Sequence, residues 1–297
     1  MQSVLIIADI EGSTGCGQPS DSQLFNDGWV RACIDQTFDI NAIVEKLFAT
    51  GRVARIKVKD FHRTGFNIFA DQLDDRVELS QGYACGPVVG IGDCSGFDSL
   101  FLVGLHAASG SEGFLPHTLT SRFSAIRFNG RLLTEAELFS ASVAESGVKP
   151  VFFSGEGLAC QQVLGAMPWL KTYAVDKPLR LPKERLREGM AAQAVEALEA
   201  GVGQIFTGSE SGTVEVLFRD GVDVAAKAAK AWGLVCKDNK VSFNVDNLNQ
   251  AYRQLIEIAY LTPFWNRHLK MGLKFFNFWG RLTHAWARRR RKLNQLS

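Results

Sequence analysis

The sequence lacks the features that would direct a chain to an export route or through a bilayer. Its first apolar run, residues 4–7, ends in acidic residues, so it does not resemble a cleavable export signal. No run of about 20 apolar residues is present, and a bilayer-spanning helix is not expected. The six cysteines have no C-x-x-C spacing, which predicts reduced thiols in a cytoplasmic protein rather than disulfides or thiolate metal ligands.

Acidic residues are missing from one part of the chain. Residues 263–297 contain nine Lys or Arg and no Asp or Glu. The remaining 24 basic and 31 acidic residues give the rest of the chain a net charge near −7, although the whole sequence carries +2. An acidic body is unlike a nucleic-acid-binding domain, so nucleic acid is not expected as its partner.

Apolar runs and helical patterns alternate along the first half of the chain. With 297 residues and 46% hydrophobic content, one large domain or two modest ones can form. The alternation predicts an α/β fold, mostly a parallel sheet sandwiched by helices. Strands are expected at 4–8, 52–59, 100–105 and 151–154, a hairpin at 122–133, and helices at 29–50, 135–146 and 157–164.

The second half is less regular. Helices are expected at 186–200, 222–232 and 246–261, the last one capped by Asp246, with strands at 212–218 and 241–243. These elements fit either a second, smaller α/β lobe or an extension of the first sheet. We divide the chain into a domain at 1–262, with its core at about 1–180 and a second lobe at about 181–262, and a tail at 263–297.

Polar side chains follow several of the predicted strands at once. Asp9 and Glu11 follow the first strand and, being two residues apart, would share a face of extended chain. Asp60 and His62 follow the second strand, and His106 follows the third. Because open α/β sheets bind ligands beyond the carboxyl ends of their strands, these side chains are candidates for one site. Glu135, at the start of a helix after the hairpin, is a further candidate.

Carboxylates mixed with imidazoles are typical ligands of zinc or manganese. Two neighbouring acids repel each other, and a cation between them removes the repulsion. With two metal ions, a bridging carboxylate is expected, and such a centre activates water. Taken alone, each histidine is more often structural than a ligand, and the two acids could be a solvated strand end. Their joint placement at strand ends favours a metal site.

The order of these residues resembles that of the zinc-dependent D-aminopeptidases, metallopeptidase family M55. The similarity covers roughly residues 4–180 and is weaker beyond them. The matching segments are Asp9-Ile10-Glu11-Gly12, Asp60-Phe61-His62, Gly104-Leu105-His106-Ala107, Pro116-His117-Thr118, and Asn129-Gly130-Arg131 leading to Glu135.

The resemblance implies a centre of two Zn²⁺ ions, with Mn²⁺ or Co²⁺ as alternatives. Asp9 would bridge both ions; Glu11 and His62 would complete one site, and His106 and Glu135 the other. His117 matches a catalytic histidine that is not a ligand. Asp60 would orient a ligand or a loop. The family also implies a decameric homo-oligomer, a short peptide substrate and a second smaller lobe.

Two segments depart from the family pattern. The loop 61–67 is bulkier and more basic than expected, and Gly155-Glu156-Gly157 replaces the usual acidic pair after a strand. Neither contains a change at an expected ligand, but both bear on which substrate fits. We therefore expect a metallo-aminopeptidase acting on short, D-amino-acid-containing peptides. A two-metal phosphoester hydrolase and an inactive scaffold remain alternatives, although no Gly-rich loop followed by Lys is present to cradle a nucleotide phosphate.

The tail combines aromatic and basic residues at helical spacing. Trp265, Leu269, Phe276, Trp279 and Trp286 fall on one stripe, and Arg and Lys recur on the opposite side. Such a basic amphipathic helix can pack on the body or on another subunit. An anionic membrane surface is a second candidate partner, and a nucleic acid or another partner a third.

Overall fold

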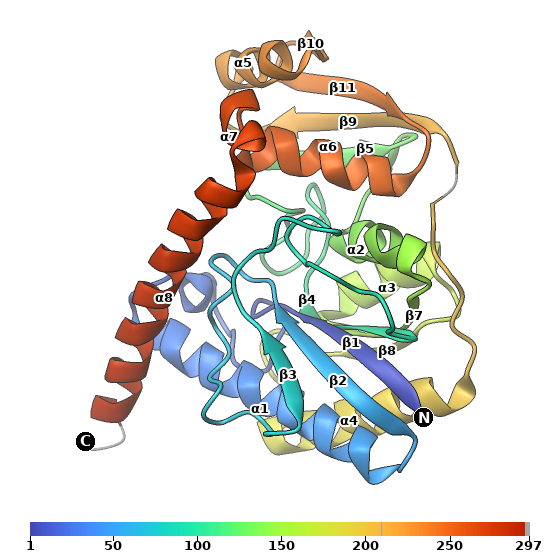
Figure 1. Cartoon of the computed structure of the whole chain (residues 1–297), viewed down its shortest axis with the longest axis vertical. Coiled ribbons are helices and arrows are strands. Elements are labelled where there is room, and N and C mark those ends of the chain that lie inside the picture. Colours follow the sequence, from blue (N-terminus) through green and yellow to red (C-terminus); the bar gives the residue numbers. More distant parts are fainter. Residues whose placement is uncertain (209, 295–297) are drawn as a thin grey trace.

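Two stacked β-sheets organise the chain in the computed structural model, which describes residues 1–208 and 210–294 (Figure 1). Within those residues the larger sheet has six parallel strands in the order β3-β2-β1-β4-β7-β8. These strands are β1 (Gln2–Ala8), β2 (Val53–Asp60), β3 (Val77–Ser80), β4 (Ser99–Leu105), β7 (Lys149–Gly155) and β8 (Lys171–Ala174). The strand order reverses between β1 and β4, which is where α/β sheets open a crevice for ligands.

Helices cover both faces of this sheet, as buried apolar strands require. α1 (Asp27–Ala49) and α4 (Lys183–Ala200) pack on one face, where Ile40, Val44 and Met190 meet Ile6 and Val103 in one apolar cluster. α2 (Glu135–Val143) and α3 (Gly157–Ala166) cover the other face (Figure 1). Short 3-10 helices, η1 (Pro19–Ser22) and η2 (Ala144–Ser146), precede α1 and extend α2.

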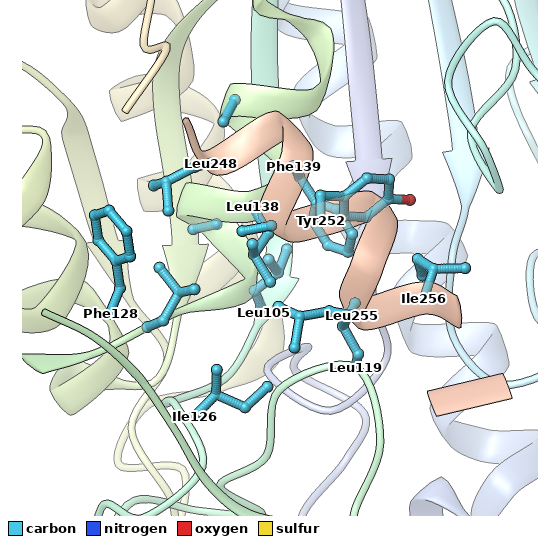
Figure 2. Packing of buried hydrophobic residues seen from close by; sticks show 14 of the residues in the cluster. Leu105, Leu119, Ile126, Phe128, Leu138, Phe139, Leu248, Tyr252, Leu255 and Ile256 are labelled. Carbon is cyan, nitrogen blue, oxygen red and sulfur yellow. The ribbon is translucent and has the colours of Figure 1, made fainter. Parts of the chain in front are cut away.

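The second sheet is antiparallel and lies beyond α2. Its order is β10-β11-β9-β5-β6, formed by β5 (Phe123–Phe128), β6 (Arg131–Leu132), β9 (Gly212–Phe218), β10 (Val235–Lys237) and β11 (Lys240–Val245). α5 (Val222–Trp232) lies on its outer side, and α6 (Leu248–Tyr260) lies between it and α2 (Figure 1). Figure 2 shows Leu248, Tyr252 and Leu255 of α6 beside Phe139 of α2, in the cluster that joins the two sheets.

The predicted α/β fold with a second lobe is confirmed. The hairpin β5-β6 pairs with β9, so the second sheet takes strands from before residue 180. α4, which follows residue 180, packs on the first sheet. Two distant segments of chain therefore build the second sheet, and a pattern read locally has no information about such pairing.

Smaller corrections concern element ends. The N-cap of α6 is Asn247, whose side chain accepts the backbone N–H of Gln250, and not Asp246. The short edge strands β3, β8 and β10 were not predicted, because each has three or four residues with partly exposed side chains and no apolar run. The hairpin turn is as predicted: Asn129 and Gly130 both have positive φ, at 49° and 84°.

The tail forms two helices, α7 (Pro263–Arg267) and α8 (Leu269–Asn294); its residues 295–297 lie outside the described part of the chain. α8 runs along the side of the molecule from the second lobe toward α1 (Figure 1). Its inner face is buried: Trp286 stacks on Trp29 with ring centroids 6.2 Å apart, and Ala287 is fully buried. Among the described helices, none is long and apolar enough to cross a bilayer.

Candidate metal centre

The carboxyl ends of three neighbouring strands place the predicted ligands together. Asp9 follows β1, His62 follows β2 and His106 follows β4, while Glu135 begins α2 above the same edge. Parallel pairing aligns these ends, because Ala8 of β1 lies opposite Asp60 of β2 and Val103 of β4. The side chains of all predicted ligands are at most 7% exposed: Asp9, Glu11, His62, His106 and Glu135.

Glu11 reaches the centre by a turn, and not by the strand alternation that the sequence predicted. β1 ends at Ala8, and Ser13 N–H donates to the Ile10 carbonyl across the turn that follows. This turn lies against the end of β4, where Gly12 N–H donates to the Gly104 carbonyl at 2.7 Å. A Cβ on Gly12 would lie 2.0 Å from the Leu105 carbonyl oxygen, so only glycine permits this approach.

Three imidazoles face the two acids of this turn. His62 Nδ1 lies 3.1 Å from Asp9 Oδ1 and 3.7 Å from Glu11 Oε2. His106 Nε2 lies 3.4 Å from Asp9 Oδ2, 3.4 Å from Glu11 Oε2 and 3.6 Å from Glu135 Oε2. His117 Nε2 lies 3.4 Å from the same Glu11 oxygen. The six side chains therefore form one continuous cluster.

Three overlapping groups in this cluster have donor atoms within 4.8 Å of one another. They are Asp9–Glu11–His62, Asp9–His106–Glu135 and Glu11–His106–His117. The first two correspond to the two predicted sites and share Asp9. The third group joins His117 to Glu11 and His106, so His117 is also within reach of an ion.

Two buried atoms of the cluster lack the partner that a bound metal ion would supply. Glu11 Oε2 and His106 Nε2 are inaccessible to solvent and have no hydrogen-bond partner in the described structure. A buried polar atom left without a partner costs about 1–3 kcal/mol. Because both atoms point toward the other donors, a shared divalent cation would satisfy them together, and the carboxylate–imidazole set suits zinc.

Backbone carbonyl groups orient the imidazole rings. His62 Nε2 lies 3.0 Å from the Ser22 carbonyl, His106 Nδ1 3.2 Å from the Ala107 carbonyl, and His117 Nδ1 2.9 Å from the Leu115 carbonyl. When these nitrogens donate, the other nitrogen of each ring turns its lone pair toward the carboxylates. This arrangement is typical of histidine ligands.

Charge and burial oppose each other in the centre. Burial would raise the pKa of Asp9, but the facing imidazoles of His106 and His62 hold that pKa well below its usual value. Burial would lower the pKa of His106, but the charges of Glu135 and Asp9 raise it well above its usual value. Burial raises the pKa of Glu135. The acids thus require positive charge, which either protons on the imidazoles or divalent cations supply.

Asp60 lies outside the cluster and is satisfied by its own loop. Its carboxylate accepts the backbone N–H groups of Asn67 at 2.5 Å and Ile68 at 2.9 Å, and the Asn67 side-chain amide at 2.8 Å. That amide also donates to the His62 carbonyl at 2.8 Å. Asp60 therefore holds the loop that carries His62, which agrees with an orienting role.

Two further residues support the site and were not predicted. Glu156 accepts the N–H of Phe114 at 2.7 Å and that of Ala107 at 3.3 Å, which anchors the loop carrying His117. Its position after β7 was a usable signal, since three other strands end in site residues. The Tyr260 hydroxyl donates to the Leu119 carbonyl, and no sequence pattern indicates that contact.

A parallel α/β sheet whose carboxyl edge gathers buried carboxylates and imidazoles places the chain among the α/β proteins with a candidate metal site at that edge. The model of the M55 peptidase family, described as D-aminopeptidase, matches residues 2–256. The chain belongs to this family and is a hydrolase of the peptidase class, so the predicted family is confirmed.

A solved structure agrees with this assignment at the level of the fold. The protein described as "Zn-dependent D-aminopeptidase DppA from Bacillus subtilis, a self-compartmentalizing protease" superposes with a TM-score of 0.78 at 18% sequence identity. The match covers 88% of this chain and 97% of that one. No curated protein matched the sequence. The family match ends at residue 256, before α7 and α8 begin.

Proposed function

We propose that the chain hydrolyses short peptides with an N-terminal D-amino acid at a centre of two Zn²⁺ ions, with Mn²⁺ or Co²⁺ as alternatives. One observation carries the proposal: two groups of buried donors share Asp9, and two of their atoms, Glu11 Oε2 and His106 Nε2, have no hydrogen-bond partner within the described structure. The family match favours peptides as the substrate. The similar Bacillus subtilis protein is described as Zn-dependent, which favours zinc.

In this proposal Asp9 would contribute to both metal sites, Glu11 and His62 would complete one site, and His106 and Glu135 would complete the other. The distances of 3.1–3.7 Å between facing donors support this arrangement, since two ligands of one ion lie about that far apart. When bound, the two ions would lower the pKa of water and polarise the peptide carbonyl. Burial of the five ligands excludes bulk solvent and strengthens their electrostatic effect.

His117 is the proposed catalytic residue. Its Nδ1 faces the Leu115 carbonyl, so its Nε2 is available on the side of Glu11. With its side chain 19% exposed, it is more accessible to solvent than the proposed ligands. We propose that Nε2 accepts a proton from the attacking water and returns it to the leaving amine. Glu156, which anchors the preceding loop, keeps the ring in place.

The proposal extends to organisation and assembly. Residues 1–262 would form the metallopeptidase domain and 263–297 an added tail. A homo-oligomer is proposed from the self-compartmentalizing description of the similar structure. A decamer is proposed as its specific form from the resemblance to the family. A cytoplasmic location is proposed from the free thiols of all six cysteines.

The test is the zinc-dependent release of D-Ala from a D-Ala-containing dipeptide, with D- and L-aminoacyl p-nitroanilides compared in parallel. We expect His117→Ala to lower kcat about 100-fold or more while bound zinc stays unchanged. His268→Ala, at an exposed histidine of the tail, is the matched control and should retain activity.

Each other outcome has a distinct meaning. Loss of zinc from His117→Ala would make this residue a ligand. Preference for the L-anilide would reject the proposed stereochemistry. Hydrolysis of p-nitrophenyl phosphate without any amide hydrolysis would indicate a phosphoester hydrolase, and zinc binding without any hydrolysis an inactive scaffold.

A further inference from the structure

One face of α8 exposes a continuous apolar stripe to solvent. Its side chains follow helical spacing and are 43–67% exposed: Met271, Phe275, Phe278 and Leu282, here called the outer stripe. Phe264 of α7, 58% exposed, lies in the adjoining turn. Exposed aromatic and aliphatic residues in a row mark an interaction surface and not chance exposure.

The opposite face of α8 already has its partner. Gly280, Thr283, Ala287 and Arg291 recur at helical spacing and are buried against the body. The Asn277 side chain exchanges hydrogen bonds with the Tyr83 backbone at 2.8 and 2.9 Å, and Arg290 pairs with Asp27 at 2.6 Å. Figure 1 shows α8 running along the side of the body. Since the inner face is occupied by these contacts, the outer stripe is left exposed to solvent.

A row of cations borders the outer stripe along one side. These exposed residues are here called the cationic edge: Lys270, Lys274, Arg281, Arg288 and Lys292. Within the described chain, none of them has a carboxylate within 4.0 Å, whereas Arg290 and Arg291 on the inner side pair with Asp27 and Asp71. The cations that meet the body are thus neutralised, and those beside the outer stripe are available for an external anion.

We propose that α8 docks the molecule on an anionic phospholipid bilayer, with the outer stripe inserted among the headgroups and the cationic edge on lipid phosphates. An apolar stripe bordered by Lys and Arg is the pattern of helices that lie in a membrane interface. Charge complementarity supports this partner, because the tail carries nine cations and no acid while the rest of the chain is near −7.

The test uses the full chain and vesicles of phosphatidylcholine, alone or with about 30% phosphatidylserine. We expect sedimentation with the anionic vesicles only, and weaker binding as salt rises from about 0.05 to 0.5 M. The variant Phe275→Glu/Phe278→Glu should lower binding at least ~20-fold. Its matched control, Val222→Glu/Val235→Glu, changes the charge equally at residues 54% and 68% exposed on the second lobe and should bind as the unmodified chain does.

A second pair of variants tests the contribution of the cationic edge separately from that of the outer stripe. Replacing Lys270, Lys274, Arg281 and Arg288 by Gln should reduce binding about 100-fold or more. Replacing the exposed Lys149, Lys227, Lys230 and Lys237 by Gln should have little effect. Circular dichroism and thermal unfolding check that every variant is folded.

Three results would overturn the proposal. They are the absence of vesicle binding by the unmodified chain, binding that both outer-stripe and cationic-edge variants retain, or a change of oligomeric state in the Phe275→Glu/Phe278→Glu variant without any effect on vesicles. The last result would assign the stripe to a second copy of the chain. Oligomeric state is measured by light scattering on the same samples.

Discussion

Leu119 connects the proposed metal ligand Glu135 to a residue of α6. Its backbone N–H donates to Glu135 Oε1 at 2.5 Å, and its carbonyl accepts the Tyr260 hydroxyl. Leu119 has a positive φ of 62°, which is uncommon for a residue with a branched side chain and indicates that these contacts hold it in place. Tyr260 thus positions Glu135 through the backbone, without touching the donor atoms itself.

Replacing this tyrosine tests the connection. We expect Tyr260→Phe to lower the free energy of unfolding by about 1–3 kcal/mol, because the buried Leu119 carbonyl loses its partner. Bound zinc should stay near the unmodified level, while kcat falls as Glu135 becomes less well held. Urea unfolding and zinc content measure both effects, and Tyr173→Phe on β8 is the control. Unchanged stability and kcat would show that the contact has no positioning role.

At the scale of elements, α8 is attached to the body by charge as well as by packing. Arg291 donates to the Asp71 carboxylate and lies over the Phe69 ring, with its Cζ 4.4 Å from the ring centroid. The Arg291 hydrogen bond lowers the pKa of Asp71 below its usual value. The contact therefore stabilises the folded chain at pH values above the usual pKa of aspartate, about 3.9, and is lost as the pH falls through the lowered value.

The lowered pKa of Asp71 predicts how the attachment of α8 depends on pH. Asp71→Asn should lower the free energy of unfolding by about 0.5 kcal/mol at pH 6, a small value because the Asp71 side chain is 41% exposed. The difference between variant and unmodified chain should shrink and then vanish as the pH falls through the lowered pKa of Asp71, because both chains then lack the charge. Urea unfolding at several pH values measures it. A difference that persists at the lowest pH would assign the effect to packing instead.

At the scale of the whole molecule, the proposed centre joins segments that are far apart in the sequence. Residues 9, 62 and 106 follow three strands and residue 135 begins a helix, so an ion bound there would link the middle of the first sheet to α2. The folded chain presents these donors together, and the unfolded chain does not. Metal binding should therefore stabilise the fold by mass action.

Removing zinc measures how much metal binding stabilises the folded chain. Free zinc at about one hundred times its Kd should add about 2.7 kcal/mol to the free energy of unfolding. In a domain of this size such an increase raises the Tm by about 5 °C or more. Calorimetry with zinc and with a chelator gives the difference, and Ca²⁺ at the same concentration is the control. Equal Tm values under all conditions would contradict a metal centre in the folded chain.

The local sequence was sufficient for much of the fold and for the candidates at the site. Buried strands are recognisable as apolar runs, and Asp9, Glu11, His62 and His106 follow them directly. Strand β9 and helix α5 begin and end at the residues that the sequence predicted. Their alternation of apolar and polar residues depends only on residues close together in the chain. The alignment of parallel strand ends then made convergence of these candidate ligands predictable.

Only the tertiary structure decided what depends on distant contacts. The pairing of β5 with β9, the turn that brings Glu11 beside Asp9, and the contact of Tyr260 with Leu119 each join residues through geometry that no local pattern encodes. The same holds for the tail. Its sequence shows an amphipathic helix, but the docking of one face on Trp29 and Asp71 determined that Met271, Phe275, Phe278 and Leu282 face solvent. Periodicity shows that a helix has faces, and packing selects which face is buried.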